Sequence, residues 1–119
     1  MAQILIVDDT ENIRRLLAIT LRHHKHEVAE AGNGQEALES LRREMPDLVI
    51  SDIEMPVMNG LKFLEALHEE FGDGAPPVLM LTGEKERVRA QALQLGARDV
   101  LVKPFTPLDL YKRIEEHLP

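Results

Sequence analysis

The sequence predicts an α/β fold, a three-layer sandwich in which a parallel sheet lies between two layers of helices. One observation is a set of short apolar runs with the length and composition of strands buried on both faces, at residues 4–7, 48–50, 78–81 and 100–102. The other is that the apolar residues between these runs recur with the period of an amphipathic helix. Strands that alternate with helices in this way are typical of parallel sheets covered on both faces.

The first half of the chain is expected to hold one helix with a clear apolar pattern, followed by a strand at the sheet edge. The helix carries apolar side chains at Ile13, Leu16, Leu17, Thr20 and Leu21. The strand, residues 27–31, alternates polar and apolar side chains, as edge strands do. A second strand at the edge agrees with the strand order 2-1-3-4-5 of flavodoxin-like folds.

The remaining helices are expected at residues 35–44, 60–71, 85–95 and 108–118. Pro107 suits the first turn of the last helix, because the first N–H groups of a helix have no partner within it. The segment 71–77, which is rich in glycine and proline, is expected to be a surface loop and not a domain boundary.

The composition is that of one globular domain. A chain of 119 residues can bury a single core, so we expect one domain over residues 1–119. Lysine and arginine number 14 against 21 aspartates and glutamates, and the net charge of -7 argues against direct binding to nucleic acid. No apolar run is long enough to span a membrane, the N-terminus lacks a secretion signal and there are no cysteines, so we expect a cytoplasmic location.

Polar residues follow four of the predicted strands at the point where each strand ends. Asp8 and Asp9 follow the first strand, Asp52 the third, Thr82 the fourth and Lys103 the fifth. The carboxyl ends of parallel strands meet along one edge of the sheet, which is where such folds bind their ligands. We therefore expect three carboxylates, one hydroxyl and one ammonium to form a single site.

Three carboxylates in one pocket repel one another, so either a cation joins them or at least one keeps its proton. Magnesium suits such a site, because it prefers hard oxygen ligands and keeps several of its waters. Simpler interpretations remain open for the individual residues. Asp8 and Asp9 could merely favour the N-terminus of the next helix, and Lys103 could merely form a salt bridge with an aspartate.

Four motifs resemble those of response-regulator receiver domains: ILIVDD at 4–9, ISDIEMPVMNG at 50–60, LTG at 81–83 and KPF at 103–105. The resemblance covers the whole chain. It implies a phosphorylation-activated switch of a two-component phosphorelay, not a metabolic enzyme, in which Asp52 accepts a phosphoryl group from a sensor histidine kinase or a phosphotransfer protein. It also implies that Mg2+ is held by Asp9, Asp52 and the backbone carbonyl of Glu54, while Asp8 acts through a bound water.

The same resemblance assigns ligands to the phosphoryl group. Lys103 and the Thr82 hydroxyl would bind phosphoryl oxygens, helped by the backbone N–H groups of Glu54 and Gly83. The bond between Lys103 and Pro104 would be a cis peptide. The domain would thereby assist its own phosphorylation and dephosphorylation.

Other positions concern the regulation and the partners of the switch. Val100 stands where the family often has an aromatic residue, so the usual aromatic readout is not expected. Glu54 and Glu84 occupy family positions that tune loss of the phosphoryl group, but they could also be solvated loop carboxylates. Arg14 and Arg15 lie on the first helix, on a face with which the family binds its kinase, but this could also be a solvated helix face. Charges that resemble the intermolecular salt bridges of winged-helix regulators imply a homodimer through the fourth helix, fifth strand and fifth helix: Arg89, Asp99, Asp109 and Arg113.

Three other functions share part of this pattern. A flavin-binding flavodoxin would share the fold, but Asp8 and Asp9 would repel its phosphate. An aspartyl-phosphate phosphatase resembles the site, but it has a second aspartate where Glu54 stands here. A receiver that only docks, without being phosphorylated, is disfavoured by the complete set of site residues.

Overall fold

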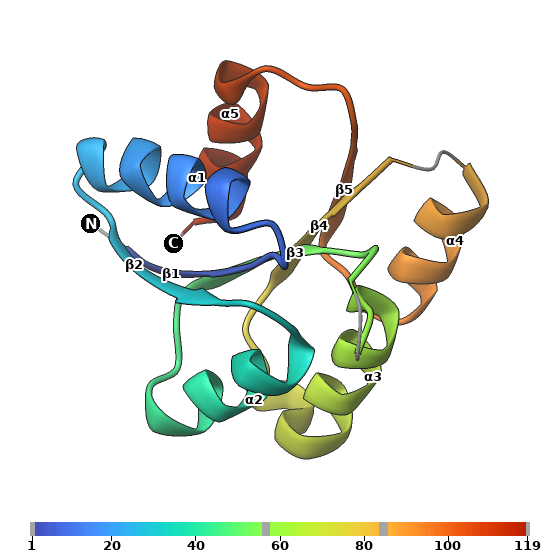
Figure 1. Ribbon diagram of the computed structural model, residues 1–119. Coiled ribbons are helices and arrows are strands. Elements are labelled where there is room, and N and C mark those ends of the chain that lie inside the picture. The colour runs from blue at the N-terminus through green and yellow to red at the C-terminus, as the bar shows by residue number, and fades with distance from the viewer. Residues whose placement is uncertain (1, 56–57, 84–85, 119) are drawn as a thin grey trace.

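The computed structural model describes residues 2–55, 58–83 and 86–118, and within them strands alternate with helices (Figure 1). The strands are β1 (Gln3–Val7), β2 (Glu27–Ala31), β3 (Leu48–Asp52), β4 (Val78–Thr82) and β5 (Asp99–Val102). The helices are α1 (Glu11–His23), α2 (Gly34–Arg43), α3 (Gly60–Phe71), α4 (Glu86–Gln94) and α5 (Pro107–His117), with a short 3-10 turn, η1 (Gly72–Gly74), after α3.

The strands form one parallel sheet in the order β2-β1-β3-β4-β5, which confirms the predicted order. The predicted difference between edge and inner strands is also confirmed. Every residue of β3 and β4 is buried, whereas β2 alternates between exposed and partly buried residues up to Ala31. The apolar runs of β1, β3 and β4 therefore lie in the middle of the sheet, where both faces are covered, while the run of β5 lies at the edge opposite β2.

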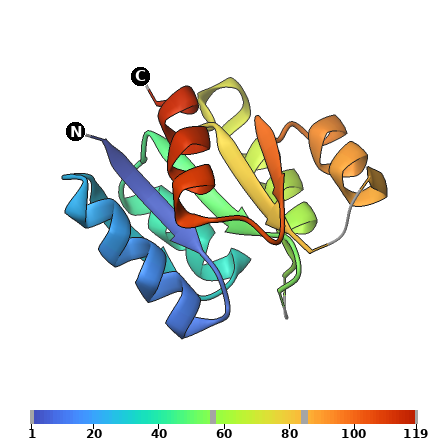
Figure 2. The same ribbon diagram turned by 90° about the horizontal axis from the view of Figure 1, so that it is seen from above.

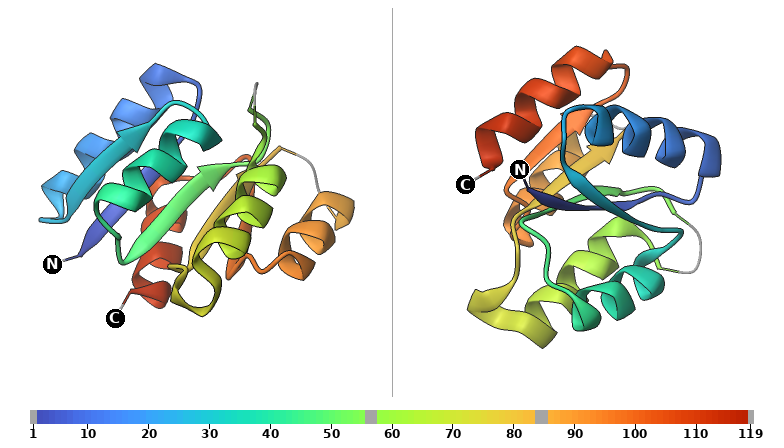
Figure 3. Two further views of the ribbon diagram at one scale, coloured as in Figure 1. Left: turned by 90° about the horizontal axis from the view of Figure 1, so that it is seen from below. Right: turned by 90° about the vertical axis from the view of Figure 1, so that its left-hand side faces the viewer.

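The helices form two layers, as expected for a three-layer sandwich. Helices α1 and α5 cover one face of the sheet, and α2, α3 and α4 cover the other (Figures 1 and 3). Successive side chains of a strand point to opposite faces. In β1, Leu5 and Val7 belong to the core beneath α2, α3 and α4, while Ile4 and Ile6 belong to the core beneath α1 and α5.

Capping side chains fix where α3 and α5 begin. Asn59 accepts a hydrogen bond from the N–H of Lys62 at 2.9 Å. Thr106 and Asp109 form a capping box at the start of α5, and Pro107 is the first residue of that helix. Because each side chain satisfies an N–H that the helix leaves unpaired, the helix starts are set by local sequence.

Helix α1 is rotated relative to the sequence expectation. Leu21 is buried and Leu17 partly buried, but Ile13 and Leu16 are 46% and 61% exposed. The expectation for these last two residues was wrong because apolar residues surround most of this helix, so their spacing did not define one face. The buried position is taken instead by Ala18, a small residue that lets the helix approach the sheet closely.

The carboxyl ends of the parallel strands lie along one edge of the sheet, and both ends of the described chain lie at the opposite edge (Figure 2). Loops that follow β1, β3, β4 and β5 therefore meet on one side of the molecule. In the part of the chain that is described, no helix is long and apolar enough to cross a membrane.

The close approach of α3 to β3 gives a first prediction. A Cβ added to Gly60 would lie 2.5 Å from the carbonyl oxygen of Asp52 and 2.7 Å from the Cα of Ile53. We expect Gly60→Ala to lower the free energy of unfolding by about 1–3 kcal/mol, the usual cost of overpacking. Gly74→Ala is the control, because an added Cβ there meets nothing within 4 Å. Urea unfolding measures both variants, and equal stabilities would contradict the close approach.

Candidate functional site

Three aspartates converge at the carboxyl edge of the sheet. Asp52 is the last residue of β3, and Asp8 and Asp9 follow β1, which pairs with β3. One carboxylate oxygen of each aspartate lies within 4.8 Å of those of the other two. The structure thus brings together the carboxylates that the sequence analysis singled out, while their roles stay predictions.

Asp8 is one of the buried acidic residues of this site. The residue is only 2% exposed, and its Oδ1 accepts a hydrogen bond from the N–H of Thr10 at 2.9 Å. Burial raises the pKa of Asp8, since the charged form loses its hydration. The hydrogen bond from Thr10 and the charge of Lys103 oppose this effect without cancelling it.

Asp52 has one oxygen near a cation and one without a partner. Its Oδ2 lies 3.3 Å from Nζ of Lys103. Its Oδ1 is buried and has no hydrogen-bond partner among the described residues. Burial raises the pKa of Asp52, the charge of Lys103 lowers it, and the neighbouring charges of Asp8 and Glu54 raise it further. The site therefore lacks positive charge.

These carboxylate oxygens fit a hard divalent cation such as Mg2+ as ligands. The donor atoms are carboxylate oxygens close enough to share one ion, and the unpartnered oxygen of Asp52 has lone pairs to offer. A cation would also stabilise the ionised forms of two carboxylates whose pKa values burial raises, Asp8 and Asp52. The backbone carbonyl of Glu54 as a further ligand stays a prediction.

The hydroxyl at the end of β4 faces a fourth carboxylate. Thr82 donates from its Oγ1 toward both oxygens of Glu54, at 3.0 and 3.1 Å, and the N–H of Gly83 donates to Oε1 of Glu54 at 2.9 Å. Sequence reasoning used only the backbone of Glu54 as a ligand and left its side chain as a tuning or solvated group. It missed this contact because no periodicity or motif indicates where a loop side chain points.

Arg14 holds the loop that carries the two neighbouring aspartates. Its Nη1 donates to the backbone carbonyl of Asp8 at 2.8 Å, and its Nε lies 3.1 Å from Oε1 of Glu30 on β2. The side chain is only 16% exposed, so the solvated interpretation was wrong for Arg14. Arg15 is exposed and pairs with Glu11 within the same helix. The spacing of apolar residues in α1 could not distinguish these two arginines.

The segment after β4 and β5 agrees with the expected backbone arrangement. The peptide bond between Lys103 and Pro104 is cis, as expected. The backbone N–H of Lys103 donates to the carbonyl of Thr82 at 2.7 Å, which ties the ends of the two strands together. Val100 is buried in the core on the side of α2, α3 and α4. Glu84 lies outside the described residues, as do Pro56 and Val57.

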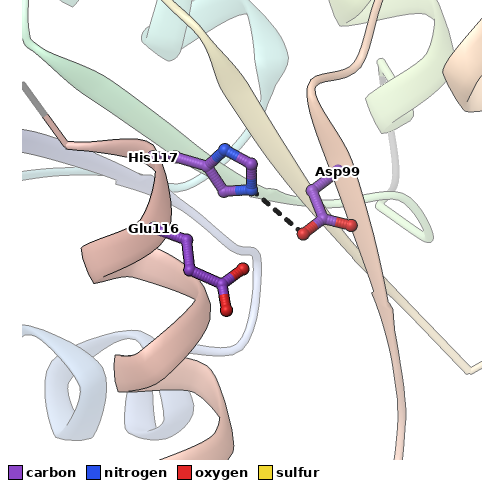
Figure 4. A group of neighbouring side chains, drawn as sticks. All are labelled: Asp99, Glu116 and His117. Carbon is purple, nitrogen blue, oxygen red and sulfur yellow. Dashed lines mark hydrogen bonds and ion pairs between the residues drawn. The ribbon is translucent and has the colours of Figure 1, made fainter.

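A second group of close ligand atoms lies on β5 and α5, at the other end of the sheet. Nε2 of His117 is 3.0 Å from Oδ2 of Asp99, with Glu116 beside them (Figure 4). Arg113 also pairs with Asp99, at 2.9 Å. Burial alone would raise the pKa of Asp99, but the hydrogen bond from His117 and the charge of Arg113 hold it below its usual value. Because Asp99 already has its counter-charge, this group is an ion-pair network that fastens α5 to β5.

Comparison with known proteins identifies relatives of the whole chain. The family model of the response regulator receiver domain matches residues 4–115. "Probable transcriptional regulator ycf27" of Porphyra purpurea is 41% identical over 117 residues, which cover 98% of this chain and 47% of that protein. The chain thus spans about half the length of the curated relatives that it matches.

Two solved structures are similar over their full lengths. The chemotaxis protein CheY4 of Vibrio cholerae is 38% identical, with a TM-score of 0.92 and 99% of both chains covered. The response regulator TrrA of Thermotoga maritima, solved in complex with Mg2+ and BeF, is 34% identical, with a TM-score of 0.86 and coverage of 99% of this chain and 100% of that one. Both similarities agree with the observed strand order.

The buried charge of Asp8 gives a second prediction. We expect Asp8→Asn to raise the free energy of unfolding at pH 7 without metal, by about 1 kcal/mol, because the variant avoids ionising a buried group and can keep the bond from Thr10. Since the pKa of folded Asp8 is raised, the wild type loses stability as pH rises from the ordinary aspartate pKa through the raised one. The advantage of the variant should therefore vanish in acid.

Chemical denaturation at a series of pH values, in metal-free buffer, measures this difference. Asp73→Asn, at an exposed residue of η1, is the control and should change stability little at any pH. A variant at Asp8 that is no more stable than the wild type at pH 7 would show that its ionised form is not destabilised by burial.

Proposed function

This chain belongs to the response regulator receiver domain family, and we propose that Asp52 is the residue that carries its phosphoryl group. The family consists of signalling switches of two-component systems, and this chain is such a switch. The position of Asp52 carries the proposal. Its carboxylate is buried at the carboxyl edge of the sheet, 3.3 Å from the ammonium of Lys103 and beside Asp8 and Asp9.

In the proposed reaction, a carboxylate oxygen of Asp52 attacks the phosphorus of a phosphohistidine. An O–P bond forms while the P–N bond breaks, and the electron pair of the broken bond stays on the ring nitrogen. Lys103 and the Thr82 hydroxyl would stabilise charge on the phosphoryl oxygens, because each is a hydrogen-bond donor at the same edge of the sheet. The same arrangement would assist the later hydrolysis of the aspartyl phosphate.

We also propose that Asp9, Asp52 and the backbone carbonyl of Glu54 hold Mg2+, and that Asp8 acts through a bound water. When bound, the ion neutralises charge on the phosphoryl oxygens. This assignment is supported by the closeness of the three carboxylates and by the unpartnered oxygen of Asp52. It also accounts for two aspartates whose pKa values are raised by burial, Asp8 and Asp52.

The proposed partner is a sensor histidine kinase or a phosphotransfer protein in the cytoplasm. Residues 1–119 would form one receiver domain, and the negative net charge of -7 argues against direct contact with nucleic acid. A relative of about twice the matched length is named as a transcriptional regulator.

Family membership argues against a flavin-binding flavodoxin and against a metabolic aspartyl-phosphate phosphatase. A receiver that only docks would share the fold and the family. It differs from the proposed function in one measurable property, the chemical reactivity of Asp52, which the next experiment tests.

The third prediction concerns phosphorylation of Asp52. Incubation with acetyl phosphate and Mg2+ should raise the intact mass of the wild type and of the control Asp73→Asn by one phosphoryl group. Asp52→Asn should stay unlabelled, because the amide is not a nucleophile of comparable strength. A chelator should stop labelling of the wild type, since the buried carboxylate needs the cation. Labelling of Asp52→Asn at the rate of the wild type would rule out the assignment, and labelling in chelator would rule out the metal's role.

The fourth prediction concerns the homodimer through α4, β5 and α5. Within one chain, Asp99 already pairs with Arg113, and this pair competes with the expected salt bridge between the same two residues across the dimer interface. We propose that these two residues exchange partners across a two-fold axis on phosphorylation. Exposed pairs contribute only about 0.2–1 kcal/mol each, so the dimer should be weak and sensitive to salt.

Mixing two single variants separates pairing within a chain from pairing between chains. Arg113→Asp and Asp99→Arg each place like charges both within the chain and across the interface. In the mixture, both cross-interface pairs become opposite in charge while both intrachain pairs stay repulsive. With beryllofluoride and Mg2+, sedimentation should therefore detect dimers in the mixture and monomers in either variant alone. Wild type that remains monomeric under the same conditions would argue against the dimer.

A further inference from the structure

The carboxylate of Glu54 occupies the donors that the proposed function assigns to the phosphoryl group. The Thr82 hydroxyl lies 3.0 and 3.1 Å from its two oxygens, and the N–H of Gly83 lies 2.9 Å from one of them. Glu54 and these two donors belong to different loops, which follow β3 and β4. The contact is therefore a tertiary one, made by an acidic side chain that reaches across the edge of the sheet.

We infer that Glu54 is an internal competitor of the phosphoryl group. Its carboxylate must release Thr82 and Gly83 before the phosphorylated state can form. The inference rests on the proposed function of Asp52. A hydroxyl and an N–H have one proton each, so a donor aimed at the carboxylate cannot at the same time donate fully to a phosphoryl oxygen. Both acceptors are anionic oxygens, and hydrogen bonds to charged acceptors are the stronger kind.

The competition has a direction that the charges at the site reinforce. Glu54 adds a further negative charge near Asp52, whose only close cation among the described residues is Lys103. An incoming phosphoryl group brings more negative charge, so the glutamate would be displaced by repulsion as well as by exchange of hydrogen bonds. Glu54 would thus lower the affinity of the site for the phosphoryl group and specify how readily the switch turns on.

Removal of the carboxylate should make the phosphorylated state easier to reach. With Mg2+ present, Glu54→Ala should bind beryllofluoride, a mimic of the phosphoryl group, about tenfold more tightly than the wild type, which corresponds to the loss of one or two competing hydrogen bonds. Glu65→Ala is the matched control, because it removes the same charge from an exposed position on α3. Its affinity should equal that of the wild type. Glu54→Gln should fall between, because it loses the charge but keeps an acceptor oxygen.

A second measurement detects the contact without metal or phosphoryl mimic. In the metal-free protein, the amide proton of Gly83 should shift upfield and exchange faster in Glu54→Ala than in the wild type, because it loses a carboxylate acceptor. Addition of beryllofluoride and Mg2+ to the wild type should shift the same signal, as the amide changes acceptor.

The outcomes distinguish this inference from the function on which it rests. Wild type that does not bind beryllofluoride at all would refute the proposed function. Beryllofluoride that binds wild type and Glu54→Ala equally well would refute the competition and leave the proposed function intact. An amide signal of Gly83 that is the same in both metal-free proteins would likewise refute the contact.

Discussion

The burial of two aspartates beside a single lysine is the constraint on which the functional end of this molecule depends. Asp8 and Asp52 are 2% and 5% exposed because Asp8 directly follows β1 and Asp52 ends β3, inner strands whose apolar residues form the core. A core built for stability alone would not place carboxylates there. The strands hold them in place, and the resulting deficit of positive charge is what supports the proposed cation.

The cationic side chains near the aspartates already contact acceptors within the protein. Arg14 is committed to the Asp8 carbonyl and to Glu30, and Lys103 lies near Asp52. Asp99, on the same sheet, shows the opposite situation, since the hydrogen bond from His117 and the charge of Arg113 lower its pKa. One residue type therefore serves two purposes, and the difference lies in the counter-charge that each aspartate receives.

The sequence predicted most of the fold because its signals are local and repeated. Buried strands, capped helices and the polar residues after each strand follow from periodicity and from the rule that ligands bind at carboxyl ends. It failed where the outcome depends on packing in three dimensions. The apolar residues of α1 surround the helix, so only its contact with the sheet decides that Ala18 is buried and Leu16 exposed. The side chain of Glu54 and the intrachain pair of Asp99 with Arg113 depend on distances between distant segments, which no linear pattern contains.

The position of β5 suggests how an event at the site could reach the helices without an aromatic residue at position 100. Lys103 directly follows β5, and among the described residues β5 pairs with β4 alone, so it is less constrained than the inner strands. Val100 packs in the core beneath α2, α3 and α4, whereas Leu101 packs beneath α1 and α5. Because His117 of α5 also pairs with Asp99, a shift of the strand would move that helix with it. Transmission would then run through the backbone of β5 and not through the rotation of a single ring, which is consistent with a valine whose χ1 is stiff.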